Sequence, residues 1–128
     1  MQQKLFKDKY PIFEMNLPKA HAKFASVAEM MNFLGEKIAD HPIALEIARF
    51  DHYAHTKAIG GEINPAILDA QNLIFCFGMQ LPSADPVAVR PRSIGITEFA
   101  DHFVINFMEA PVQAANDSMQ QWVQALKA

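Results

Sequence analysis

Residues 50 to 55 gather the side chains of this sequence that are best suited to chemistry. The run Phe-Asp-His-Tyr-Ala-His supplies a carboxylate, two imidazoles and a phenol. In a strand His52 and His55 point to opposite faces, whereas in a helix they stand on the same side. Asp51 and His55 share a face in both cases, and a carboxylate that holds an imidazole in one tautomer is typical of a general base. Asp51 and His55 are therefore the candidate catalytic pair.

The same cluster admits a metal site, a ligand site or a purely structural role. Zinc needs three or four protein ligands, so His52 and His55 would require partners from elsewhere in the chain. The available residues are His21, His41, Cys76 and His102. The spacing matches no metalloprotease or zinc-finger pattern, so we predict no metal site. Tyr53 joins the face of Asp51 only in an extended backbone, and in the structural alternative Asp51 caps a turn at the end of a strand.

Arg90 and Arg92 form a second candidate binding element. They are separated by a single proline, and two guanidinium groups held apart by a rigid residue can bind a carboxylate or phosphate through paired hydrogen bonds. The alternative is a solvated loop whose arginines pair with surface acids. We expect Cys76, which lies in an apolar run, to be a small buried side chain with little reactivity.

Three strands are predicted from periodicity. Residues 12 to 17 alternate between apolar and polar side chains. Residues 43 to 50 also alternate, with Ile43, Leu45 and Ile47 on one face and Ala44, Glu46, Ala48 and Phe50 on the other. Residues 73 to 77 are apolar throughout, which indicates a central strand that is buried on both faces.

A hairpin is predicted near the C-terminus. Residues 93 to 99 and 103 to 108 flank a short turn. A two-residue loop puts Ile94 and Ile96 on the same face as the apolar residues of the second strand, Phe103, Ile105 and Phe107. A three-residue loop would scatter them, so we predict the tighter turn.

Two amphipathic helices should cover one face of the sheet. Ser26 and Glu29 match a capping box, and apolar residues recur at helical spacing over residues 27 to 40. Pro111 opens the second helix. Its apolar stripe comprises Val112, Ala115, Met119, Trp122, Val123 and Leu126.

Two connecting segments carry turn signals. Gly60 and Gly61 break the chain, and Asn64 followed by Pro65 is typical of a cap and the first residue of a short helix, ending near residue 70. Residues 79 to 92 contain three prolines and are predicted to form a loop.

Composition restricts the domain organisation and the class of partner. A chain of 128 residues, 51% hydrophobic, suits one domain over residues 1 to 128. The net charge of -3 and the scattered basic residues give no general attraction to nucleic acid or membranes, so we expect neither as a partner. No apolar run approaches the roughly 20 residues of a membrane span, and no signal peptide is evident. We expect a cytoplasmic protein, in agreement with its single cysteine.

One pattern extends over about residues 43 to 108. It consists of Asp51 and His52 at the end of a strand, followed by Ala58, Gly60, Pro65, Phe77, Gly78, Pro91, Ile94 and Glu98. This pattern resembles the small bacterial domains of unknown function numbered 302. The Asn-Pro pair usual in that family is Met79-Gln80 here, and residues 65 to 72 look like an insertion. The resemblance implies a compact, frequently dimeric α+β domain without established activity, and a short helix after Asp51.

Together these features predict a single two-layer α+β domain, with a largely antiparallel sheet of four to six strands and two main helices on one face. The predicted function is a homodimeric binding module for a small polar or acidic ligand. The predicted ligand pocket is formed by Asp51, His52, Tyr53, His55, Arg90 and Arg92. The alternatives are a small enzyme, metal-assisted or with His55 as general base, and a protein-protein interaction or structural dimer module. The sequence identifies no cofactor.

Overall fold

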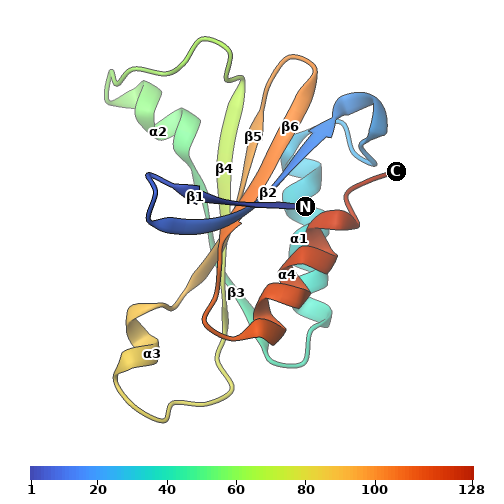
Figure 1. The fold of residues 1–128 in the computed structure, drawn as a ribbon. Helices are drawn as coiled ribbons and strands as arrows, with labels where there is room; N and C mark the ends of the chain where they lie inside the picture. The colour runs from blue at the N-terminus through green and yellow to red at the C-terminus, as the bar shows by residue number, and fades with distance from the viewer.

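An open sheet of six antiparallel strands forms the framework of the protein (Figure 1). The computed structural model describes all of residues 1 to 128. The strands are β1 (Gln2–Phe6), β2 (Tyr10–Pro18), β3 (Ala44–Asp51), β4 (Asp69–Phe77), β5 (Arg92–Glu98) and β6 (His102–Met108). They lie in the order β1-β2-β6-β5-β4-β3, and every neighbouring pair is antiparallel. The predicted α+β class is confirmed.

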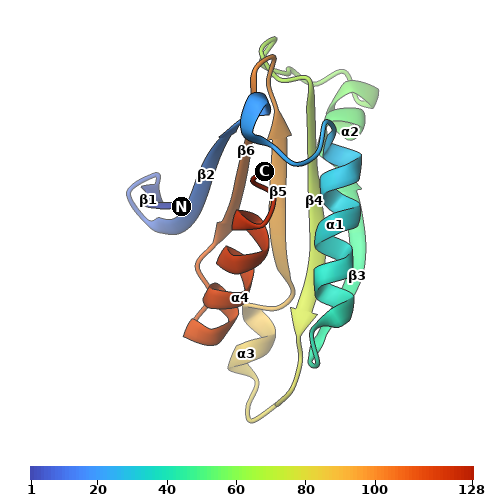
Figure 2. The same ribbon diagram turned by 90° about the vertical axis from the view of Figure 1, so that its right-hand side faces the viewer.

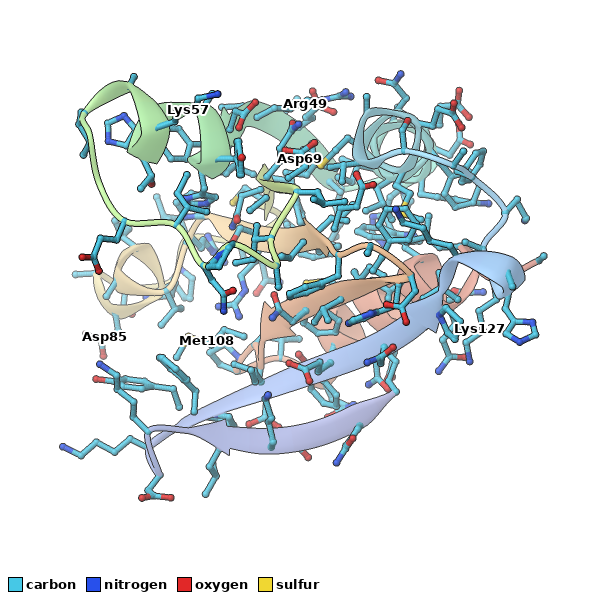
Figure 3. All side chains as sticks on the ribbon, turned by 90° about the horizontal axis from the view of Figure 1, so that it is seen from above. Arg49, Lys57, Asp69, Asp85, Met108 and Lys127 are labelled. Atoms are coloured by element: carbon cyan, nitrogen blue, oxygen red, sulfur yellow. The ribbon has the colours of Figure 1, made fainter.

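The helices lie on both sides of this sheet, but only one side is covered. The helical segments are η1 (Lys19–His21), α1 (Val27–Asp40), α2 (His52–Ala58), α3 (Asp85–Ala88) and α4 (Gln113–Gln124). Figure 2 shows α1 and α4 side by side against one face, as predicted. The short helices α2 and α3 stand at the two ends of the opposite face, and the tip of the β1-β2 hairpin turns toward that side (Figure 1). Seen from above, Lys57 of α2 and Asp85 of α3 lie on the side away from Lys127, which follows α4 (Figure 3).

Helix α1 forms where its capping box predicts it. The Ser26 hydroxyl accepts a hydrogen bond from the Glu29 amide at 3.2 Å, and the Glu29 carboxylate accepts one from the Ala25 amide at 3.2 Å. These contacts satisfy amides that have no partner within the helix. The helix buries the residues of its apolar face, Val27, Met30, Met31, Leu34 and Ile38.

Helix α4 buries Met119, Trp122 and Val123 of its predicted stripe, while Val112 is 63% exposed at its N-cap. Asn116 is the one buried polar residue of the protein. Its carboxamide accepts from the Ala110 amide at 2.7 Å and donates to the Ala110 carbonyl at 2.9 Å. Two hydrogen bonds to one residue thus fix the connection between β6 and α4.

The β5-β6 hairpin has the predicted register. Ile96 lies opposite Ile105, and the Phe99 amide donates to the His102 carbonyl at 2.9 Å. The loop therefore consists of Ala100 and Asp101 alone, and the inward isoleucines and phenylalanines share the face beneath the helices.

The expectation that residues 73 to 77 are buried on both faces is wrong. Leu73 and Phe75 are buried beneath the helices, but Ile74 and Cys76 point to the open face and are only half-buried. Their strand β4 lies next to the edge strand β3, and α1 and α4 cover only the other face of the sheet (Figure 1). Cys76 is correspondingly less buried than predicted.

Two further expectations about local structure fail. The segment from Pro65 is not helical, because the Asn64 side chain accepts the Ala66 amide at 2.9 Å and closes a turn before β4 begins at Asp69. In β3 a bulge between Glu46 and Ala48 interrupts the alternation. Ala48 and Phe50 therefore lie on the open face rather than with Glu46.

Strand β1 was not predicted from the sequence. It pairs with β2 through a tight turn in which Lys7 and Asp8 have φ values of 53° and 58°. Both residues lie in the left-handed region, as a type I′ hairpin turn requires.

Candidate functional site

The cluster at residues 50 to 55 lies at the start of α2, which settles whether this segment is helix or strand. The Asp51 carboxylate caps this helix by accepting the Ala54 amide at 2.8 Å. The His52 ring bonds through Nε2 to Asn72 Oδ1 at 2.8 Å. The rings of His52 and His55 lie 4.6 Å and 5.4 Å from the Phe50 ring. Both histidine rings thus contact Phe50, and neither is held by the Asp51 carboxylate, which caps the helix. Tyr53, between them in the sequence, is half-buried.

Arg90 and Arg92 lie at the other end of the sheet, beside α3. Arg90 donates to the Gln80 carbonyl at 2.8 Å, and Arg92 donates to the carbonyls of Val89 and Met108. Both guanidinium groups therefore hold the loop around them, and partial burial lowers the pKa of Arg92 below its ordinary value.

The two predicted halves of the binding pocket do not converge. Asp51 lies opposite Gln71 of β4, whereas Arg92 lies opposite Phe75. These positions are four residues apart along the strand, which corresponds to about 13 Å. The structure does not bring the histidines and arginines together into one small pocket. Nor does any group of three or more His, Cys, Asp or Glu residues lie close enough together to hold a metal ion.

A second Asp-His pair closes the β5-β6 hairpin. His102 Nδ1 lies 2.7 Å from Asp101 Oδ1, and its ring stacks on Phe99 with centroids 4.6 Å apart. The hydrogen bond from His102 is the largest cause that lowers the pKa of Asp101 below its ordinary value of 3.8. The Asp101 side chain is exposed on the turn.

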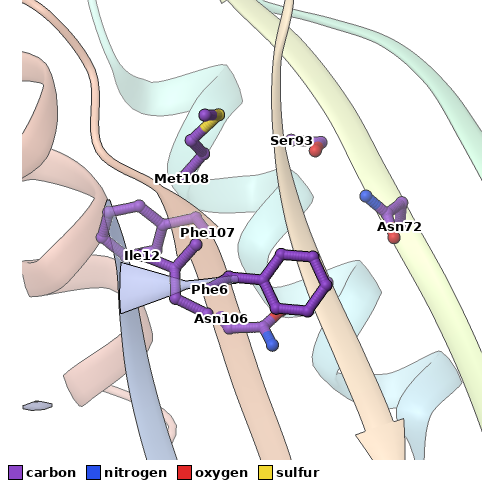
Figure 4. A pocket seen from close by; sticks show the side chains of 8 residues that line it. Phe6, Ile12, Asn72, Ser93, Asn106, Phe107 and Met108 are labelled. Carbon is purple, nitrogen blue, oxygen red and sulfur yellow. The ribbon is translucent and has the colours of Figure 1, made fainter. Parts of the chain in front are cut away.

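The open face of the sheet holds a hollow that the sequence analysis did not identify (Figure 4). It has a volume of about 260 Å³, and no charged side chain lines it. Its lining comprises Phe6, Ile12, Asn72, Ser93, Gly95, Asn106, Phe107 and Met108. The hollow lies over the middle of the sheet, on the face that α1 and α4 leave uncovered.

A polar row crosses the floor of this hollow. Asn72 of β4 lies opposite Gly95 of β5, which in turn lies opposite Asn106 of β6. A Cβ atom at Gly95 would come within 3.0 Å of Asn106 Oδ1 and 3.4 Å of Asn72 Oδ1. The two carboxamide oxygens therefore converge on the space that the missing side chain leaves free. We call this group of three residues the carboxamide floor.

Apart from Ser93, the walls of the hollow are apolar, and the charges around it are paired. Phe6 reaches in from β1 beside Asn106, and Met108 lies at the other end (Figure 4). These two side chains are 52% and 46% exposed. Glu14, the next residue of the row after Asn106, forms an ion pair with Lys4 at 2.9 Å. A molecule in this hollow would meet polar groups below and apolar groups at its sides.

One signal in the sequence could have indicated the carboxamide floor. Asparagine and glycine are both depleted in strands, yet Asn72, Gly95 and Asn106 each occupy a strand interior. An isolated glycine in a strand often marks a place where a ligand or another backbone approaches closely.

The model of one protein family matches residues 1 to 128, the whole chain. The chain belongs to the family of unknown function DUF6858. The resemblance to the domains numbered 302 is therefore wrong, although the short helix after Asp51 is present. No curated protein matches this DUF6858 chain. None of its helices is long and apolar enough to cross a membrane.

Proposed function

We propose that this protein is a binding module that holds a small polar molecule against the carboxamide floor. The observation that carries the proposal is the convergence of Asn72 Oδ1 and Asn106 Oδ1 over Gly95. Small-ligand sites combine a concave apolar surface with a few convergent polar groups. The hollow on the open face has both features.

The residue types of the floor support a role beyond stabilising the sheet. Differences in β-propensity span about 1 kcal/mol per residue, and asparagine and glycine are at the unfavourable end. Three such residues on neighbouring strands therefore weaken the middle of the sheet. Residues whose structural preference disagrees with the element they occupy are expected at functional sites.

Helix α2 contributes by positioning Asn72. His52 Nε2 lies 2.8 Å from Asn72 Oδ1, and the imidazole ring is held against Phe50. This contact keeps the Asn72 carboxamide from rotating away from the floor. The predicted involvement of His52 in ligand binding thus becomes a positioning role in this proposal, and a carboxamide fixed in advance loses less entropy on binding.

The proposal can be tested by an NMR screen of small polar fragments against ¹⁵N-labelled protein. The screen should include carboxylates, phosphates, amides and alcohols. We expect binding fragments to shift the backbone amide of Gly95 and the side-chain amides of Asn72 and Asn106. Perturbations that gather elsewhere, or a screen in which no fragment reaches Gly95, would contradict the proposal.

Two variants distinguish the floor from the rest of the open face. Asn106→Ala should weaken binding and reduce the shift of Gly95 at a given fragment concentration, because it removes one of the two convergent carboxamides. Asn16→Ala is the matched control, since Asn16 is an exposed asparagine of β2 outside the hollow. We expect this control to bind as the unmodified protein does.

A further inference from the structure

We infer that the group seated over Gly95 is an N–H donor, so that the ligands of this site are amides, lactams or ureas rather than carboxylates. This inference rests on the proposed function and narrows its ligand class. Its basis is that the two atoms nearest to the free space at Gly95 are both carboxamide oxygens, Asn106 Oδ1 and Asn72 Oδ1. Oxygens of this kind accept hydrogen bonds and do not donate them.

The orientation of Asn72 is set by its neighbour on α2. The oxygen and the amino group of a carboxamide have nearly the same shape, so the surrounding hydrogen bonds determine which of the two occupies each position. Nε2 of His52 can donate to Asn72 Oδ1 in the contact of 2.8 Å. A carbonyl oxygen has two lone pairs, so Asn72 Oδ1 can accept a second hydrogen bond from a ligand.

The charges around the hollow disfavour an anion. The carboxylate of Glu14 follows Asn106 in the polar row, and Lys4 is paired with it at 2.9 Å. Arg90 and Arg92 are bonded to backbone carbonyls near α3. A carboxylate over Gly95 would therefore place its oxygens against two carbonyl oxygens, without a cation in the lining to compensate.

An amide ligand can form hydrogen bonds with the floor both as a donor and as an acceptor. Its N–H can donate to a convergent oxygen, and its carbonyl can accept from the Nδ2 group of the same asparagine. An apolar substituent would then lie between Phe6 and Met108, which line the hollow. A volume of about 260 Å³ is small, so the site suits a molecule of about the size of a single substituted ring.

Benzamide and benzoate test this inference because they have nearly the same shape. Only benzamide has N–H donors, and only benzoate is charged at neutral pH. We expect benzamide to bind about tenfold or more tightly, as judged from the titrated shifts of Gly95 and Asn106. Equal or tighter binding of benzoate overturns the donor assignment while it leaves the proposed function intact.

A variant separates donor recognition from shape. Asn106→Asp keeps oxygens in the floor but removes the amino group and adds a negative charge. Benzamide should still bind to this variant, and the preference for benzamide over benzoate should increase. A preference that falls or reverses would contradict the inference.

The two proposals fail in different ways. If no amide, lactam or urea shifts Gly95 but another fragment of the screen does, the amide class is wrong and the site is right. If no fragment shifts Gly95, both proposals are wrong.

Discussion

Replacing Gly95 with alanine should separate binding from folding in this protein. The added methyl group would occupy the space over the carboxamide floor, 3.0 Å from Asn106 Oδ1 and 3.4 Å from Asn72 Oδ1. The closer of these oxygens belongs to the Asn106 side chain, which can turn slightly, so the sheet itself need not move. The methyl group would, however, take the place of the ligand's N–H group.

The expected magnitudes follow from this geometry. Blocking two neutral hydrogen bonds, each contributing about 1 kcal/mol, weakens binding by about 2 kcal/mol, or roughly thirtyfold. Alanine is favoured over glycine in a strand by roughly 0.5–1 kcal/mol, and the close contact with Asn106 offsets part of this gain. The free energy of unfolding should therefore remain unchanged or rise by up to about 1 kcal/mol.

The assay combines urea unfolding with an NMR titration of benzamide. Gly78→Ala is the matched control, because its added Cβ would meet only Cys76 Sγ, at an ordinary distance of 3.7 Å. This control should leave the affinity for benzamide unchanged. Gly95→Ala protein that folds normally and binds benzamide as tightly as before would refute the reasoning.

Three further predictions concern stability, pH and assembly. Asn116→Ala should lower the free energy of unfolding in urea by about 2–4 kcal/mol, since it leaves the buried amide and carbonyl of Ala110 unpaired; a loss under about 1 kcal/mol would contradict this. The pKa of Asp101 should lie below 3.8 in an NMR titration and return toward that value in His102→Phe. Because folding lowers this pKa, the ionised Asp101 carboxylate stabilises the folded protein above pH 3.8, and this contribution is lost as the pH falls through the folded-state pKa. We expect the chain to form a homodimer, and Leu45→Lys, at a 68% exposed position of the edge strand β3, to weaken it; a monomeric mass for the unmodified chain in sedimentation would disprove this.

Local signals predicted the helices and the hairpin because their determinants are close together in the sequence. The capping box of Ser26 and Glu29 fixes the start of α1, and the spacing of Ile94 to Phe107 fixes the register of β5 against β6. Strand β1 gave no such signal, because it is a short, exposed edge strand whose turn uses Lys7 and Asp8 rather than glycine. The bulge in β3 was equally hidden, because a single extra residue leaves the composition of a strand unchanged.

The candidate site was difficult to predict for a different reason. The cluster from Phe50 to His55 was visible because its members adjoin one another in the sequence. The carboxamide floor takes its members from three strands, and at least ten residues lie between each member and the next. Their meeting depends on the register of two strand pairs, and the register of β4 against β5 was not available from the sequence.

The most direct test of the proposed binding site is the position of bound benzamide. Intermolecular nuclear Overhauser effects between its aromatic protons and the protein would establish this position. We predict contacts to the Met108 methyl group and the Phe6 ring, which form the walls above Gly95. Contacts to the imidazoles of His52 and His55 without any to Met108 or Phe6 would place the ligand at α2 instead and contradict the central claim.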